Sequence, residues 1–154
     1  MPDYRERLWP TPWIYLTSLL LVPASILVLA PVSLPAGIVT GVILYVAVAG
    51  SLTLTSPVIE VSDGRVRAGR AQVPLELTGQ AVPAEGEAAR IERGTGLDAR
   101  AFLVIRGWIR DVVRIPIEDP ADPAPYWLVS TRHPHEMAAA INGSRRPRVG
   151  GEPA

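Results

Sequence analysis

The most distinctive pattern in the chain is a long apolar stretch near its N-terminus. From Leu8 to Ile59 the sequence holds no Asp, Glu, Lys, Arg or His. A bilayer core about 30 Å thick is crossed by about 20 helical residues, so this stretch is too long for one span and fits two. The sequence predicts transmembrane helices over 13–30 and 36–54, separated by a turn with prolines at both ends. Pro23 predicts a kink in the first helix, because proline removes an intrahelical hydrogen bond.

The arginines around this stretch predict its orientation. Arg5 and Arg7 precede the first span, more arginines follow the second, and the connecting turn carries no charge. Because basic residues are enriched on the cytoplasmic side of membrane proteins, we expect a multi-pass protein of the bacterial cell (inner) membrane with both termini in the cytoplasm. The domain organisation is then an anchor over 1–57, a cytoplasmic domain over 58–142 and a disordered tail over 143–154.

Alternation of apolar and polar residues after the spans predicts a small β-rich domain. Ile59 and Val61 alternate with polar neighbours, Asp63-Gly64 favours a tight hairpin turn, and the alternation resumes over 65–68. Pro74 and Pro116 predict strand ends or sheet edges, because proline cannot donate to a ladder. Further strands are expected over 71–77, 113–117, 102–105 and 127–129, the last two as central strands.

Local sequence signals predict the structure of two other segments. Glu85 to Gly96 is charged and contains several glycines, so we expect a loop there. Residues 134–142 predict a helix with Pro134 in its first turn and Gly143 as its C-terminal cap. The element order predicts an α+β membrane protein, in which a two-helix hairpin precedes a small antiparallel split β-barrel closed by one C-terminal helix.

Composition limits the chemistry. The chain has no cysteine and no lysine, so disulfides, thiolate nucleophiles, Cys-ligated zinc and Schiff bases are excluded. The formal net charge is zero, with 15 basic and 15 acidic residues, which argues against nucleic acid as a partner because nucleic-acid binding needs a basic excess. We expect no cofactor and no metal site.

Two groups of residues are candidates for contact with a partner. Arg65, Arg67 and Arg70 follow the second span closely and either meet anionic lipid headgroups or form a solvated strand face. The proline-rich segment from Asp119 to Arg132 aims Tyr126 and Trp127 into a strand, with Arg132 farther along it. These three side chains either hold an acidic peptide or lipid headgroup, or Trp127 lies in the core, Tyr126 bonds a backbone group and the aspartates cap turns.

Evidence for catalysis is weak. His133-Pro134-His135 lacks a further ligand at metal-binding spacing, which favours helix capping or plain exposure for both histidines. Asp98 and Arg100 are two residues apart and form either an exposed ion pair or part of a ligand site that includes His133.

The element order resembles that of pleckstrin-homology-like domains, a likeness at the level of fold only. At the level of residues, nearly the whole chain except the tail resembles the uncharacterised actinobacterial membrane-protein family called domain of unknown function 3093. The resemblance implies no activity, ligand or catalytic residue. It lies in the segments Tyr4-Arg5-Glu6-Arg7-Leu8, Arg67-Ala68-Gly69-Arg70-Ala71-Gln72-Val73-Pro74, Leu97-Asp98-Ala99-Arg100-Ala101-Phe102-Leu103 and the whole of 119–132.

Three functions are therefore open. The first is a non-enzymatic interaction or scaffold module held at the membrane, with a membrane or cytoplasmic protein as its partner. The second is a lipid-handling protein or membrane-surface enzyme that uses Asp98, Arg100 and His133, which requires these side chains to converge. The third is a homo-oligomeric pore assembled through the small residues Gly37 and Gly41, whose spacing allows close helix approach.

Overall fold

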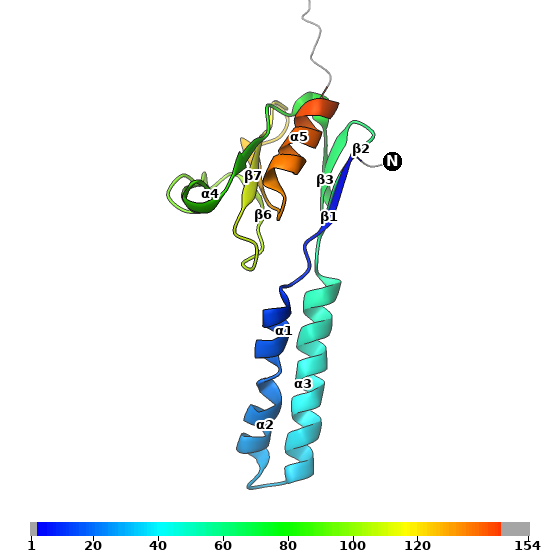
Figure 1. Cartoon of the computed structure of the whole chain (residues 1–154), viewed down its shortest axis with the longest axis vertical. Coiled ribbons are helices and arrows are strands. Elements are labelled where there is room, and N and C mark those ends of the chain that lie inside the picture. The colour runs from blue at the N-terminus through cyan, green and yellow to red at the C-terminus, as the bar shows by residue number, and fades with distance from the viewer. Residues whose placement is uncertain (1–2, 146–154) are drawn as a thin grey trace, which may run out of the picture. The chain divides into compact units, whose positions relative to one another are not determined.

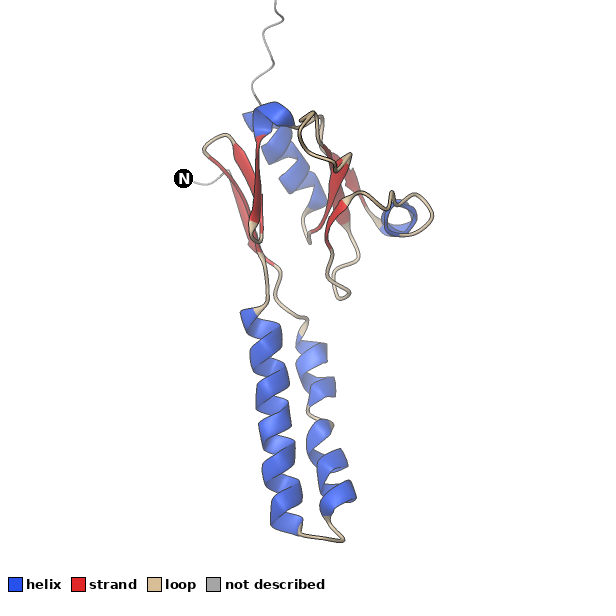
Figure 2. Ribbon diagram, turned by 180° about the vertical axis from the view of Figure 1, so that it is seen from behind, coloured by secondary structure: helices blue, strands red, loops and turns tan. Residues whose placement is uncertain are grey.

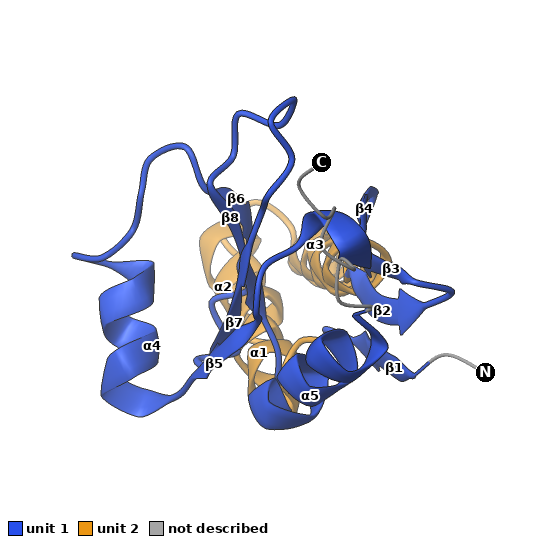
Figure 3. Ribbon diagram, turned by 90° about the horizontal axis from the view of Figure 1, so that it is seen from above, with its two compact units in different colours: residues 1–8, 57–154 blue, residues 9–56 orange. Residues whose placement is uncertain are grey.

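The computed structural model describes residues 3–145 and divides into two compact units. One unit consists of residues 9–56, and the other is built from the chain on both sides of it (Figure 3). The part of the predicted tail beyond residue 145 lies outside the described residues.

The first unit is a hairpin of helices. The first predicted span forms α1 (Pro12–Ser18) and α2 (Leu21–Leu29), and the second forms α3 (Leu34–Leu54), which runs alongside them (Figure 1). The break between α1 and α2 is consistent with the predicted kink. Pro23 has no amide hydrogen to donate to Leu19, four residues earlier, and the helix is interrupted at Leu19 and Leu20.

Two glycines let α3 approach α2 closely. A Cβ added to Gly37 would lie 2.9 Å from Ile26 Cα, and one added to Gly41 would lie 2.8 Å from Val22 Cα. These contacts are too short for any side chain, so the small-residue face of α3 is occupied by α2 of the same chain. The pore hypothesis depended on this face for contacts between copies, and the structure uses it within one copy.

Many hydroxyl groups of the hairpin form hydrogen bonds inside it. The Tyr15 hydroxyl lies 2.9 Å from Thr53 Oγ1, which joins α1 to α3. Hydroxyls also donate to backbone carbonyls three or four residues earlier, at Thr17, Ser18, Ser25, Ser51, Thr53 and Thr55. The outward side chains are apolar and largely exposed, with Leu27 at 79% and Leu54 at 82%. This arrangement suits an apolar solvent, in which polar groups must find internal partners.

The second unit contains a sheet that the N-terminal segment completes. Strands β1 (Tyr4–Arg7), β2 (Val58–Ser62), β3 (Arg65–Ala68) and β4 (Ala71–Pro74) form it in that order, and all neighbours are antiparallel. The β2–β3 hairpin is confirmed, with positive φ at Asp63 and Gly64, as a type I′ turn requires. Strand β1 was not predicted. It joins the sheet by pairing with β2, which follows the helical hairpin in the sequence.

A second sheet follows the order β5-β7-β8-β6. Its strands are β5 (Val82–Ala84), β7 (Val112–Pro116), β8 (Tyr126–Ser130) and β6 (Phe102–Val104). Strand β8 is central, as expected, but β6 is an edge strand and runs parallel to β8. The prediction of an all-antiparallel split barrel is wrong on this point, and the two sheets are separate rather than closed. The register that places β6 beside β8 depends on contacts far apart in the sequence.

The helices of this unit also correct the expectations. The segment predicted as a loop contains α4 (Gly86–Arg93), an amphipathic helix that buries Ala89. The predicted strand 71–77 ends at Pro74, and Leu75–Leu77 form a 3₁₀ turn, η1. The C-terminal helix is confirmed as α5 (Pro134–Ser144), which continues through Gly143 instead of ending there.

Helix α5 lies between the two sheets (Figure 2). Its buried residues Met137, Ala138 and Ile141 share one core with side chains from both sheets. Asn142 extends this contact, because its side chain accepts a hydrogen bond from Ala81 N (2.9 Å) and donates one to Ala81 O (3.0 Å). The helix therefore holds the sheets together.

The helix contact predicts different effects for alanine at two glycines of α3. Gly41→Ala forces the helices apart, because its Cβ meets Val22 Cα at 2.8 Å, and should destabilise the hairpin by about 1–3 kcal/mol. Gly50→Ala meets nothing within 4 Å and should be neutral or stabilise by up to about 1 kcal/mol through helix propensity. Thermal unfolding in detergent, followed by circular dichroism, measures both, and equal melting temperatures would contradict the packing.

Candidate interaction surfaces

Arg65 and Arg67 lie on the outer face of the β1–β4 sheet and Arg70 lies in the β3–β4 turn, so the predicted arginines do not form one group. Strand pairing places Arg5, Glu60 and Arg67 side by side in one row. Arg65 lies two residues before Arg67 in β3, next to the hairpin turn, and pairs with Ser62. Arg70 lies at the opposite end, directly after Gly69, whose amide donates to Val58 O (2.9 Å).

Arg5 and Arg7 were not predicted as surface residues of this sheet. Both side chains are exposed, while Tyr4 and Leu8 are buried on the inner side. The signal was present as alternation over 4–8, but the segment is only a few residues long and its partner strand comes after both helices. The outer face thus carries arginines from segments that precede and follow the helical hairpin in the sequence.

Tyr126 and Trp127 are core residues, with 3% and 4% exposure. The Tyr126 hydroxyl accepts a hydrogen bond from Asp98 N (2.8 Å), and the Arg114 guanidinium lies 4.1 Å from the ring centroid. Trp127 packs against the ring of Phe102, with centroids 4.8 Å apart. Neither ring is available to a partner in this conformation, which favours the interpretation of these residues as core over that of a contact surface.

The turn that precedes them is built from its own aspartates. Asp119 Oδ1 accepts a hydrogen bond from Ala121 N (2.9 Å), and Asp122 Oδ1 accepts one from Ala124 N (2.8 Å). Each aspartate therefore closes a local turn, as the structural interpretation of this segment expected.

Arg132 is engaged by a carboxylate of β1. Its Nη1 lies 3.4 Å from Glu6 Oε1, and the Glu6 side chain is only 10% exposed. Glu6 Oε2 also accepts hydrogen bonds from the hydroxyls of Tyr4 (2.7 Å) and Thr131 (2.6 Å). Burial raises the pKa of the Tyr4 phenol; a hydrogen bond with Thr131 acts in the opposite direction, and Glu6 adds to the rise. This polar cluster joins β1 to the end of β8.

Asp98, Arg100 and His133 do not converge. Asp98 and Arg100 form an ion pair (3.0 Å) near Tyr126, and hydrogen bonds from Arg100 hold the pKa of Asp98 below its usual value. His133 follows the other end of β8, where its Nδ1 lies 3.9 Å from Glu136. Within residues 3–145, no group of three His, Cys, Asp or Glu side chains is placed to hold a metal ion.

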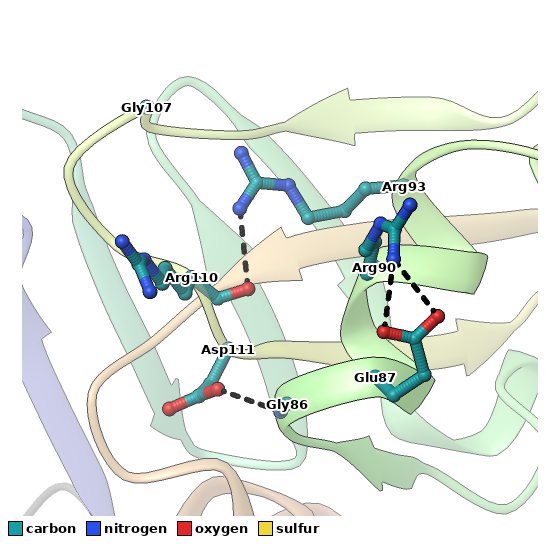
Figure 4. A pocket seen from close by; sticks show the side chains of 7 residues that line it. All are labelled: Gly86, Glu87, Arg90, Arg93, Gly107, Arg110 and Asp111. Carbon is teal, nitrogen blue, oxygen red and sulfur yellow. Dashed lines mark hydrogen bonds and ion pairs between the residues drawn. The ribbon is translucent and has the colours of Figure 1, made fainter.

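A pocket of about 660 Å³ lies between α4 and the segment before β7 (Figure 4). Its charges are largely used internally. Arg90 pairs with Glu87 (3.2 Å), Arg93 donates to the carbonyls of Ile109 and Arg110, and Asp111 accepts a long hydrogen bond from Gly86 N. The Arg110 side chain points away from Arg90 and Arg93 in Figure 4. The arginines therefore do not surround one ligand position.

The open edge of the second sheet was missed by sequence reasoning. Strand β6 pairs with β8 on one side only, and its residues Phe102 and Leu103 are 37% and 44% exposed. An edge strand with exposed apolar side chains is a template for pairing with another chain. The run Phe102-Leu103-Val104-Ile105 was interpreted as a central strand because all four residues are apolar. Its composition does not show which strands lie next to it.

Residues 3–141 match the sequence model of a family described as Protein of unknown function (DUF3093). The chain belongs to this family. The match runs from the start of β1 into α5, so DUF3093 spans both units of the structure. No curated protein and no solved structure matches the chain.

In this DUF3093 protein, the cluster around Glu6 predicts a large difference between adjacent residues. Glu6→Ala leaves the buried hydroxyls of Tyr4 and Thr131 with only each other as partners, so one of the two loses its acceptor, which should cost about 1–3 kcal/mol of unfolding free energy. Arg5→Ala changes an exposed side chain on the opposite face of β1 and should stay within about 0.5 kcal/mol of the parent. Denaturant unfolding in detergent, followed by tryptophan fluorescence, tests this, and equal effects would contradict the assigned role of Glu6.

Proposed function

We propose that this protein is a two-span integral protein of the bacterial cell membrane, whose cytoplasmic α+β unit is a non-enzymatic interaction module. Two segments, Pro12–Leu29 and Leu34–Leu54, are long and apolar enough to cross a bilayer. Their outward side chains are exposed and apolar, and the hydroxyls noted above are bonded within the hairpin. These features support membrane insertion because each exposed apolar side chain would be unfavourable in water.

The pairing of β1 with β2 supports the topology. Arg7 pairs with Val58, so the chain leaves and re-enters one sheet at neighbouring positions. Two spans between these positions return the chain to the side from which it left. The arginines on both flanks favour the cytoplasm for that side.

The observation that carries the interaction role is the open edge of β6. Its exposed Phe102 and Leu103 offer apolar contacts, and its free backbone edge offers hydrogen bonds to an extended segment of a protein partner. The competing enzyme hypothesis has less support, because Asp98 and Arg100 lie at one end of β8 and His133 follows the other.

The absence of cysteine from the sequence allows a direct topology test. Val32→Cys places a thiol in the turn between α2 and α3, and Ala88→Cys places one on α4; both positions are exposed. A membrane-impermeant maleimide added to spheroplasts should label Val32→Cys at once and Ala88→Cys only after lysis. The reverse pattern would establish the opposite topology, and release of the chain by alkaline carbonate would exclude membrane insertion.

Crosslinking from β6 tests the interaction role. A photo-crosslinking amino acid at Leu103 should give one protein adduct in native membranes, whereas the same group at Ala88 should not, because α4 is not the proposed contact. Leu103→Asp should abolish the corresponding copurification with little change in stability, since the side chain is 44% exposed. Absence of a Leu103 adduct, or identical adducts from both positions, would refute β6 as the contact edge.

A further inference from the structure

The two ends of the β1–β4 sheet carry side chains of opposite charge. We call the end where β1 and β2 connect to the helical unit the anchored end. Arg7 and Arg70 lie there, and Arg5, Glu60 and Arg67 form the next row. At the far end, Asp3, Asp63, Arg65 and Glu76 line one surface hollow. Arginine thus dominates the anchored end, and acidic residues dominate the far end.

In the described part of the chain, three of the four arginines at the anchored end are not ion-paired with the acids near them. Glu60 accepts a hydrogen bond from Ser62 Oγ (3.0 Å), and Glu6 faces the opposite side of β1, where it pairs with Arg132. Among the described residues, Arg5, Arg67 and Arg70 have no ion pair. Their positive charge is available to an external anion.

Only short connections join this end to the predicted spans. Only residues 8–11 separate β1 from α1, and only residues 55–57 separate α3 from β2. The potential of an anionic membrane surface extends about one Debye length, roughly 8 Å at physiological salt. Trp9 and Trp13 lie in and just after the first connection, and tryptophan prefers the membrane interface.

We propose that the anchored end of this sheet binds the anionic headgroups of phospholipids through Arg5, Arg67 and Arg70. The inference rests on the membrane insertion proposed above and is independent of the partner edge at β6. Of the three arginines predicted to contact lipid, this proposal keeps Arg67 and Arg70 and leaves out Arg65, which lies at the acidic far end. Headgroup binding fixes this end of the sheet against the surface and keeps the acidic end away from it.

The full chain in nanodiscs provides the test. A fluorophore on Gln72→Cys reports the anchored end, since Gln72 pairs with Arg67 and is exposed, and one on Glu76→Cys reports the far end. Discs contain phosphatidylcholine alone or an equal mixture with phosphatidylglycerol, each with a nitroxide-headgroup lipid as quencher. A label on Leu27→Cys, quenched by an acyl-chain nitroxide, reports membrane insertion separately.

The expected result is stronger quenching at Gln72 in anionic discs than in neutral ones, with no such difference at Glu76. Raising salt from 0.1 to 1 M shortens the Debye length from about 10 to about 3 Å and should abolish the difference. Arg5→Gln, Arg67→Gln and Arg70→Gln together should abolish it too, each arginine contributing about fivefold to the bound population, whereas Arg65→Gln should retain it.

The outcomes separate the two proposals. Loss of quenching at Leu27 would refute membrane insertion. Normal quenching at Leu27 with equal Gln72 signals in both kinds of disc, or an equal loss from Arg65→Gln and from the triple variant, would refute headgroup binding and leave the anchor intact.

Discussion

The pairing of β1 with β2 is the constraint on which the rest of the structure depends. Four residues before the helical hairpin bond to strand residues after it, in register from Tyr4 with Val61 to Arg7 with Val58. This pairing makes one folded unit from two separated pieces of chain. It also determines which face each side chain takes, so Glu6 points into the unit while Arg5 and Arg7 point out.

The two faces of β1 have different physical roles. Its inner face contributes Tyr4 and Leu8 to the core that α5 shares with both sheets, and Glu6 joins it to Thr131 and Arg132. A buried carboxylate is stable there only because several donors surround it. Its outer face adds Arg5 and Arg7 to a sheet in which β3 carries Arg65 and Arg67.

Local patterns predicted much of the fold, and long-range pairing accounts for what they missed. The apolar helices, the Asp63-Gly64 hairpin and α5 each depend on neighbouring residues, and each was found. Strand β1 was missed because its partner follows both helices, and β6 was misplaced because register with β8 determines that it is an edge. The same limit applies to the surfaces: alternation shows that Tyr126 and Trp127 lie on a strand, but only the packing of Phe102 and Asp98 shows that both rings are enclosed.

The split origin of the first sheet has a consequence for biosynthesis. Strand β1 is made before the helices, and its hydrogen-bonding partner β2 is made only after them. In the two-span topology proposed above, the sheet is completed only after α3 has returned the chain to the side from which it left. A chain inserted with one helix misplaced leaves β1 and β2 on opposite sides, with Tyr4 and Leu8 uncovered. Under the proposed insertion, folding of the unit that contains both sheets therefore depends on the correct placement of both helices.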